Sequence, residues 1–190
     1  MRRNKALFLD RDGVINADCG YVHRPEEFEF LDGIFDLCKA AQALDYLLLV
    51  VTNQAGIARG YYTEEDFLRI TAWMINEFRQ RNVTIAKVYY CPYHVDGKGV
   101  YRRDSSDRKP NPGMFLRAIE EFELAPEASA LIGDQLSDIY AAEAAGIGTR
   151  IWLGGKTGCI PDIAPGLYME QNLNDVRNRF FATVATGSAI

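Results

Sequence analysis

Short continuous apolar runs are the feature that most constrains how this chain can fold. The runs lie at Ala6–Leu9, Leu47–Val51, Lys87–Tyr90, Ala130–Ile132 and Arg150–Leu153. A strand with one face in water alternates apolar and polar residues, whereas a strand buried on both faces is apolar throughout. These runs therefore predict strands in the interior of a mostly parallel sheet.

Helical patterns separate the apolar runs. The first helix, which ends near Asp45, places five apolar residues on one face: Ile34, Leu37, Cys38, Ala41 and Leu44. Three further helices are expected to begin at capping residues, at Thr63 before Glu-Glu-Asp, at Asn111 before Pro112, and at Ser137. Strands that alternate with helices form βαβ units. We therefore expect an α/β fold with a doubly wound, mostly parallel sheet and helices on both faces.

Length and composition indicate one ordinary globular domain. The 190 residues are enough for one packed domain, which we expect to span 1–190 with a frayed tail over 185–190. No apolar run approaches the roughly 20 residues needed to span a bilayer, and the first is shorter than the about 7–15 residues of a signal peptide. We therefore expect a cytoplasmic protein that binds no membrane. The net charge of −5 argues against nucleic acid as a partner.

Two further expectations concern thiols and assembly. The four cysteines, Cys19, Cys38, Cys91 and Cys159, are widely spaced, which favours free thiols in a chain without a secretory signal. We expect a monomer or a weak oligomer.

Polar residues follow the predicted strands with regular placement. They are Asp10 and Asp12 after the first run, Thr52 and Asn53 after the second, Asp134 and Asp138 after Ala130–Ile132, and Lys109 before the helix at Asn111. Any one of them alone is consistent with a turn or a helix cap. Ligands of such a sheet bind beyond the carboxyl ends of its strands. A shared position at that edge therefore indicates a functional site.

Phosphoryl transfer to a carboxylate is the chemistry that uses this set. A nucleophilic Asp10 can approach a phosphate dianion only if a divalent cation reduces the repulsion, and Asp10 and Asp134 offer the oxygen ligands that Mg²⁺ prefers. Thr52 and Asn53 can donate hydrogen bonds to the phosphoryl oxygens, and Lys109 can stabilise the charge that develops on them. Asp12 can protonate the leaving alkoxide and later deprotonate water. The repulsion between the two neighbouring carboxylates would then be tolerated, because Asp10 binds a cation and Asp12 carries out the proton transfer.

The same motifs resemble those of the haloacid dehalogenase superfamily of phosphatases. These motifs are Asp-Arg-Asp-Gly after a strand, Thr-Asn after a second strand, a lysine, and Gly-Asp-x-x-Ser-Asp. Longer stretches, such as FLDRDGVIN, VVTNQAGIARGYYTEEDF and IGDQLSDIYAAEAAGI, are similar to the branch that contains heptose bisphosphate phosphatases and histidinol phosphatases. The similarity covers roughly residues 5–155.

This resemblance implies a role for each motif residue. Asp10 would be the nucleophile, Asp12 the general acid and base, and Thr52, Asn53 and Lys109 the phosphoryl-binding residues. Mg²⁺ would be held by Asp10, the main-chain carbonyl of Asp12, and Asp134. Substrate contacts would come from Asp18, Cys19, Gly20, Tyr21, Gln54, Arg59 and Arg108. Of these, Arg108 is suited to bidentate recognition of a phosphate or of neighbouring hydroxyls.

The chain departs from these relatives in a loop where they often carry zinc. Relatives have Cys-x-His followed by Cys-x-Cys before Arg-Lys-Pro. Here Tyr93 stands at a usual ligand position, and Ser105 and Asp107 replace the later cysteines. Because structural zinc sites favour thiolates, we expect no zinc, although Cys91, His94, Asp104 and Asp107 could in principle bind a metal.

The motif spacing narrows the substrate. The intervals from Asp10 to Thr52 and from Lys109 to Asp134 leave no room for a large cap domain beside the scaffold helices. An open cleft would suit an extended sugar bisphosphate. The resemblance implies removal of the C7 phosphate of a heptose 1,7-bisphosphate, which leaves heptose 1-phosphate for nucleotide activation in surface polysaccharide synthesis.

Two alternatives stay open. One is a histidinol-phosphate phosphatase. The other is a receiver-like signalling domain, which also places Asp, Thr and Lys on a doubly wound sheet. Asp12 argues against a receiver because it could hydrolyse the acyl phosphate that a receiver must preserve.

Overall fold

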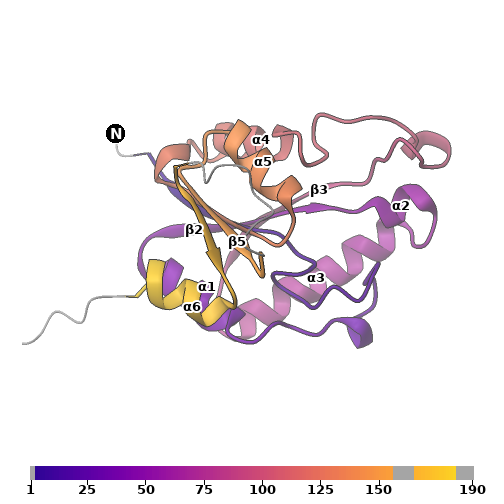
Figure 1. Ribbon diagram of the computed structural model, residues 1–190. Coiled ribbons are helices and arrows are strands. Elements are labelled where there is room, and N and C mark those ends of the chain that lie inside the picture. Colours follow the sequence, from indigo (N-terminus) through magenta and orange to yellow (C-terminus); the bar gives the residue numbers. More distant parts are fainter. Residues whose placement is uncertain (1–2, 156–164, 183–190) are drawn as a thin grey trace, which may run out of the picture.

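The computed structural model describes residues 3–155 and 165–182 and contains a six-stranded sheet (Figure 1). The strands are β1 (Lys5–Leu9), β2 (Tyr46–Asn53), β3 (Ile85–Cys91), β4 (Ala130–Gly133), β5 (Thr149–Leu153) and β6 (Leu167–Glu170). Their order is β3-β2-β1-β4-β5-β6, and each neighbouring pair is parallel. All five predicted runs are strands of this sheet. The order reverses at β1, so the sheet is doubly wound as expected.

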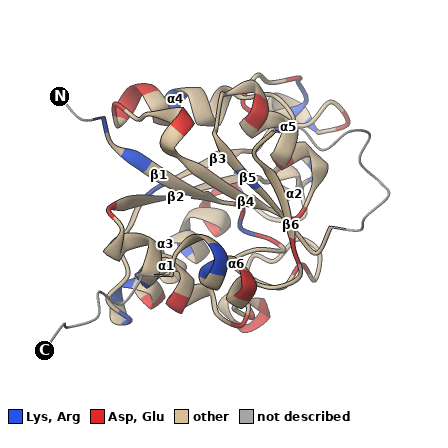
Figure 2. Ribbon diagram, turned by 60° about the vertical axis from the view of Figure 1, so that its left-hand side comes forward, with Lys and Arg blue, Asp and Glu red and all other residues tan. Residues whose placement is uncertain are grey.

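Helices cover both faces of the sheet (Figure 2). One face is covered by α1 (Ile34–Ala43), α3 (Glu64–Gln80) and α6 (Leu173–Phe180), and the other by α4 (Gly113–Glu121) and α5 (Leu136–Ala144). The short helix α2 (Ala55–Arg59) follows β2 directly, beyond the carboxyl end of that strand. Single turns of 3-10 helix lie at Pro25–Glu27, Gly99–Tyr101 and Pro126–Ala128.

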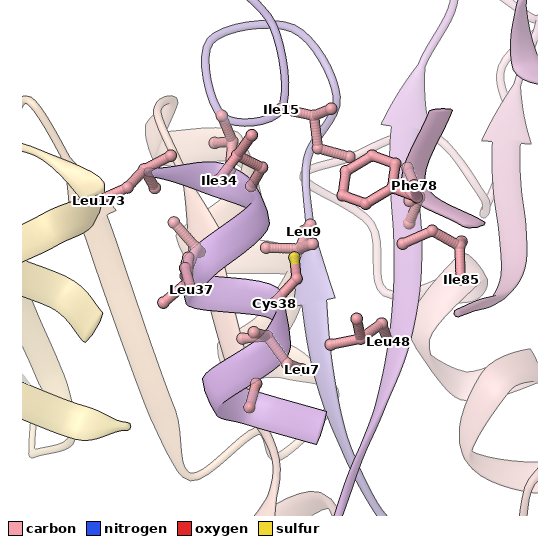
Figure 3. Close-up of a cluster of buried hydrophobic side chains, with 14 of the residues drawn as sticks. Leu7, Leu9, Ile15, Ile34, Leu37, Cys38, Leu48, Phe78, Ile85 and Leu173 are labelled. Atoms are coloured by element: carbon pink, nitrogen blue, oxygen red, sulfur yellow. The ribbon is translucent and has the colours of Figure 1, made fainter. Parts of the chain in front are cut away.

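Alternate residues of each central strand enter two separate cores. In β1, Leu7 and Leu9 pack with α1 in the cluster of Figure 3, whereas Ala6 and Phe8 pack against α4 and α5 on the opposite face. All four side chains are fully buried. An alternating pattern would place polar groups in one of these cores, which explains why the central strands are apolar throughout.

Of the three predicted helix caps, one is confirmed and two are wrong. Thr63 caps α3, and its hydroxyl accepts a hydrogen bond from the Asp66 main-chain N–H while Asp66 accepts one from the Thr63 main chain. Asn111 does not cap α4, because its side chain donates back to the Ser105 carbonyl and the helix begins after Pro112. Ser137 lies inside the first turn of α5, which Gln135 begins.

The segments between the motifs hold scaffold elements, with no inserted cap domain among the described residues. Residues 11–51 contain the first loop, α1 and most of β2, and residues 110–133 contain α4 and β4. The sequence patterns did not predict α2, β6 or α6. Cys19, Cys38 and Cys91 are free thiols, as expected, whereas Cys159 and the predicted frayed tail lie outside the described residues.

Candidate active site

Asp10, the first residue after β1, forms a buried ion pair with Lys109. Lys109 Nζ lies 3.0 Å from Asp10 Oδ1 and 2.6 Å from Asp138 Oδ1, and it also donates to the Val51 carbonyl. Asp10 Oδ1 accepts a further hydrogen bond of 2.7 Å from the Arg11 main chain, so the carboxylate is held in one orientation. The three ionised side chains are almost fully buried. The end of β1 therefore presents a fixed carboxylate beside a fixed ammonium.

The pKa values show that this part of the site is short of positive charge. Burial raises the pKa of Asp10; Lys109 opposes this, while Asp138, Asp12 and Asp134 raise it further, so the net shift is upward. Burial lowers the pKa of Lys109, but the charges of Asp10 and Asp138 outweigh that effect and raise it above its ordinary value. Lys109 therefore stays protonated, and the surrounding carboxylates are left with too few cations.

Asp134 has the properties of a metal ligand that lacks a partner. Its Oδ1 is buried and accepts no hydrogen bond, whereas Oδ2 accepts one of 2.7 Å from Gln135. Burial, reinforced by Asp138, raises the pKa of Asp134 to about 6. Oxygen atoms of Asp10, Asp134 and Asp138 lie within 4.8 Å of one another. A hard divalent cation fits this set of oxygen donors.

Within this acidic group, Asp10 and Asp134 are the residues free to bind such a cation. Asp138 is engaged by Lys109 through Oδ1 and by the Gln135 main-chain N–H through Oδ2, where it closes the first turn of α5. Asp138 thus holds the Lys109 ammonium in place through an ion pair. This role was not predicted from the sequence. Asp138 is the last residue of the Gly-Asp-x-x-Ser-Asp motif. The motif does not reveal its role, because an aspartate that caps a helix and one that pairs with a lysine have the same sequence pattern.

Gly13 allows the chain after β1 to approach Asp134. Its φ of +86° is in the left-handed region, and a Cβ at this position would lie 2.3 Å from Asp134 Oδ2. A side chain of any size is therefore excluded here by both backbone strain and space. The glycine of the Asp-Arg-Asp-Gly motif makes room for the Asp134 side chain.

Asp12 is paired with Arg11, which the sequence analysis did not single out. The Arg11 side chain, 1% exposed, contacts both oxygens of Asp12 through Nε and Nη2 at 2.9–3.2 Å and donates to the Val22 carbonyl. Asn16 and Gln54 donate to the same carboxylate at 3.0 and 3.2 Å. The expected repulsion between Asp10 and Asp12 is thus reduced by a separate cation for each. Sequence alone does not indicate this pairing, because an arginine between two aspartates gives the same pattern whether it is buried or exposed.

Thr52 and Asn53, the last residues of β2, have different side-chain roles. Asn53 Oδ1 accepts from the Lys109 main-chain N–H at 3.1 Å, and its Nδ2 donates to the Lys109 carbonyl at 3.0 Å. The Asn53 side chain therefore anchors Lys109, and the second hydrogen of its amide is left for a phosphoryl oxygen. Thr52 accepts a hydrogen bond from Gln54 at 2.9 Å, which leaves its hydroxyl proton for another acceptor.

A cleft of about 410 Å³ opens over these residues. The site residues that line it are Asp10, Asp12, Asp18, Gly20, Tyr21, Thr52, Asn53, Gln54, Arg108, Lys109, Asp134 and Asp138. Cys19 and Arg59, both expected at the substrate, do not line it. Cys19 is exposed, and Arg59 lies behind Tyr21, to whose hydroxyl it donates at 2.9 Å.

Two arginines lie in or next to the cleft. Arg108 lines the cleft directly and Arg59 supports Tyr21. Both act on one imidazole: burial lowers the pKa of His94, and the charges of Arg108 and Arg59 lower it further. We call this pair, Arg108 in the cleft lining and Arg59 beside the lining residue Tyr21, the cationic rim.

The residues of the loop where relatives often bind zinc have other partners. Cys91 is buried and its thiol contacts the Tyr93 carbonyl, and His94 Nδ1 accepts from the Asp96 main chain at 3.0 Å. Asp107 lies 3.1 Å from Arg117, and Asp104 accepts from the Ser105 main chain. In the described part of the chain, the acidic group at Asp134 is the one cluster suited to a metal. The expectation that this protein binds no zinc stays a prediction.

Comparisons with known proteins agree with this geometry. A family model described as HAD-hydrolase-like matches residues 106–160. A curated relative from Burkholderia mallei, named D-glycero-alpha-D-manno-heptose-1,7-bisphosphate 7-phosphatase, is 56% identical over 150 residues, or 78% of this chain and 79% of the relative. A protein of the same name from Campylobacter jejuni is 50% identical over 149 residues, or 78% of this chain and 82% of the relative. Six further relatives, 44–48% identical, are named for the beta anomer of the same substrate.

One solved structure with a similar fold contains bound ligands. D,D-heptose 1,7-bisphosphate phosphatase from B. bronchiseptica, complexed with magnesium and phosphate, has a TM-score of 0.79 at 26% identity and covers 92% of this chain and 96% of its own. Among the described residues of the present chain, no helix is both long enough and apolar enough to cross a bilayer. By sequence identity and coverage, the chain belongs to the heptose bisphosphate phosphatase family of HAD-like hydrolases.

Proposed function

We propose that this protein is a Mg²⁺-dependent phosphatase that removes the C7 phosphate of D-glycero-α-D-manno-heptose 1,7-bisphosphate. The observation that carries the proposal is the position of Asp10 at the base of the cleft. It lies between the Lys109 ammonium, 3.0 Å away, and the unpartnered oxygen of Asp134. The names of the relatives supply the substrate class.

The site residues account for both halves of the reaction. Asp10 Oδ1 is held by Arg11 and Lys109, which leaves Oδ2 to attack phosphorus. The first half requires Asp12 to be protonated when substrate is bound; as the bond between phosphorus and the C7 oxygen breaks, Asp12 gives this proton to the leaving alkoxide. Water then attacks the phosphorus of the aspartyl phosphate and loses a proton to Asp12. The bond to Asp10 breaks, inorganic phosphate leaves, and both aspartates return to their starting states.

Asp10 and Asp134 would hold Mg²⁺, with the main-chain carbonyl of Asp12 as a third ligand. When bound, the ion supplies positive charge that offsets repulsion between the nucleophile and the phosphate dianion. Lys109 holds the adjacent carboxylate oxygen and is placed to stabilise charge on the transferring group. Thr52 keeps a hydroxyl proton available for a phosphoryl oxygen.

The cationic rim supports a substrate with a second phosphate. Arg108 lines the cleft and Arg59 holds the lining residue Tyr21, and the C1 phosphate of an extended bisphosphate would bind at these guanidinium groups. Histidinol phosphate carries one phosphate and would leave this rim unused. The rim therefore favours the bisphosphate over the histidinol alternative.

The α anomer is proposed because the relatives from Burkholderia mallei and Campylobacter jejuni, 56% and 50% identical, are both named for it. The anomers differ only at C1, so discrimination between them belongs to the rim and not to the reacting centre. A phosphate-release panel with the α anomer, the β anomer and histidinol phosphate tests this point. We expect kcat/KM for the α anomer to exceed that for the β anomer by about tenfold, the equivalent of about 1.4 kcal/mol. A preference for histidinol phosphate would contradict the proposed substrate class.

Asp10→Asn tests the nucleophile. An amide can neither attack phosphorus nor act as an anionic metal ligand, so turnover should be abolished while the fold persists. Asp36→Asn, the same substitution at an exposed carboxylate on α1, is the matched control and should keep full activity. Asp10→Asn protein that retained a tenth of the wild-type rate would disprove the assignment.

A further inference from the structure

The Gln54 side chain is buried, and its polar atoms are hydrogen-bonded to other protein groups. It is 1% exposed, although its position in the cleft wall and the family resemblance both suggest a substrate contact. Nε2 donates to Asp12 Oδ2 at 3.2 Å and to Thr52 Oγ1 at 2.9 Å, and Oε1 accepts from the Tyr62 hydroxyl at 2.6 Å. The amide therefore links the general acid and base to a phosphoryl-binding residue.

The charge of Asp12 determines which way this amide points. In this arrangement Asp12 is paired with Arg11 as a carboxylate, and the Gln54 NH₂ group donates to it and to Thr52. The carbonyl oxygen then faces Tyr62, which must donate. Burial raises the pKa of Tyr62 to about 12, so its phenol keeps the required proton at neutral pH.

The Tyr62 ring is held by its surroundings. It lies against Gly56 so closely that a Cβ on Gly56 would be 2.2 Å from the ring. On the other side it stacks on the His23 ring, with centroids 5.1 Å apart and planes 7° from parallel. The hydroxyl is therefore a fixed donor, and removing it need not move the ring.

We propose that Tyr62 is a positioning residue for phosphoryl transfer, because its hydroxyl orients the Gln54 amide that holds Asp12 and Thr52 together. This inference rests on the proposed phosphatase function and adds a residue that does not touch substrate. By accepting from Gln54, Thr52 directs its own proton to the phosphoryl group, and Asp12 is kept near the leaving oxygen. Loss of the Tyr62 hydroxyl would free the amide to rotate and loosen both contacts.

The two reaction steps depend differently on Asp12, which gives the inference a specific kinetic signature. An alkoxide leaving group needs the proton of Asp12, whereas nitrophenolate leaves without one. Hydrolysis of the aspartyl phosphate needs Asp12 as a base for either substrate. Misplacing Asp12 should therefore slow both steps for the sugar bisphosphate but mainly the second step for p-nitrophenyl phosphate.

Tyr62→Phe removes only the hydroxyl, and Tyr89→Phe is its matched control. Tyr89 is similarly buried and donates an equally short hydrogen bond, 2.6 Å, to Glu121 on α4, outside the cleft. For the sugar bisphosphate we expect Tyr62→Phe to lower kcat about five- to tenfold, the loss of one net hydrogen bond, with KM within about twofold of wild type. With p-nitrophenyl phosphate, stopped flow should show a burst approaching one nitrophenolate per chain. Tyr89→Phe should match wild type in both assays.

A double-mutant cycle with Gln54→Leu tests whether Tyr62 acts through Gln54. In the Gln54→Leu background, Tyr62→Phe should have no further effect on kcat. Independent losses that multiply would overturn the relay, as would an unchanged kcat or a rise in KM alone for Tyr62→Phe. If Gln54→Leu does not fold, the nitrophenolate burst of Tyr62→Phe and its effects on kcat and KM still test whether Tyr62 is a positioning residue. Wild-type protein that hydrolyses no phosphate ester would refute the proposed function itself, which separates that failure from failure of the relay.

Discussion

At the scale of single residues, the site is a set of buried charges that neutralise one another locally. Lys109 is shared between Asp10 and Asp138, and Arg11 is paired with Asp12. Removing one member of a buried pair leaves the other without compensation, which costs far more than loss of an exposed pair. The residues proposed to be catalytic are therefore also structural ones, and variants at these positions must be judged on stability as well as rate.

Lys109→Ala should affect both properties. Loss of the ammonium beside the transferring group is expected to lower kcat by about two to three orders of magnitude, by analogy with deleting one oxyanion donor. Because Asp138 is left buried and unpaired, the free energy of unfolding should also fall by about 3–5 kcal/mol. Steady-state kinetics and urea denaturation measure the two effects. Lys87→Ala, which breaks an exposed pair with Glu121, is the control and should cost less than about 1 kcal/mol.

Arg108→Ala should act on binding instead. A contact to a remote phosphate is made in both the ground and the transition state, so its loss mainly raises KM and leaves kcat nearly unchanged. The effect should be large for the heptose bisphosphate and small for p-nitrophenyl phosphate, which cannot reach the rim. Equal losses of kcat on the two substrates would place Arg108 at the reacting centre and contradict the remote role.

At the scale of elements, strands were predicted better than helix ends. A buried strand is recognised by its composition alone, and all five apolar runs are strands in the structure. A helix start depends on which nearby group a polar side chain contacts. The Asn111 side chain donates to the Ser105 carbonyl instead of capping the helix that follows it, so the residue type alone did not reveal this contact. The elements without a strong pattern, such as the four-residue β6, were not predicted because packing against β5 defines them.

The geometry of the turn after β1 predicts that Gly13 cannot be replaced by a larger residue. Gly13→Ala places a Cβ where Asp134 lies and forces a left-handed conformation on alanine. We expect loss of magnesium affinity and of activity. Gly154→Ala is the matched control, because its φ is also positive, at +68°, but its Cβ would meet nothing within 4 Å. It should cost only about 1 kcal/mol of stability and keep full activity. Wild-type activity in Gly13→Ala would contradict the tight contact with Asp134.

At the scale of the whole molecule, the parallel sheet gathers residues that are far apart in the sequence. Asp10 follows β1, Thr52 ends β2 and Asp134 follows β4, and these strands are neighbours in the sheet. The carboxyl ends of parallel strands meet at one edge, so each motif contributes a group to the same cleft. Helices cover both faces of the sheet (Figure 1), and the cleft is lined by residues at this edge.

Metal content is a property of the assembled site and can be measured on intact protein. Added Mg²⁺ should raise the melting temperature, with a gain of about 2.7 kcal/mol when its concentration is 100 times the dissociation constant. Chelation should abolish activity. Asp134→Asn should remove the Mg²⁺-dependent shift, and elemental analysis should find little zinc. About one tightly held zinc per chain would contradict the prediction made from Ser105 and Asp107.

The sequence by itself determined the parallel sheet, the edge that carries the site and the identities of Asp10, Thr52, Lys109 and Asp134. Those follow from residue types at strand ends, where backbone geometry leaves little choice of position. Only the tertiary structure decided how the side chains divide their contacts. It placed Arg11 inside against Asp12, gave Asp138 to Lys109, and enclosed Gln54 under Tyr62. The physical reason is that a buried polar group must find a partner, and which partner it finds depends on distances that no linear spacing encodes.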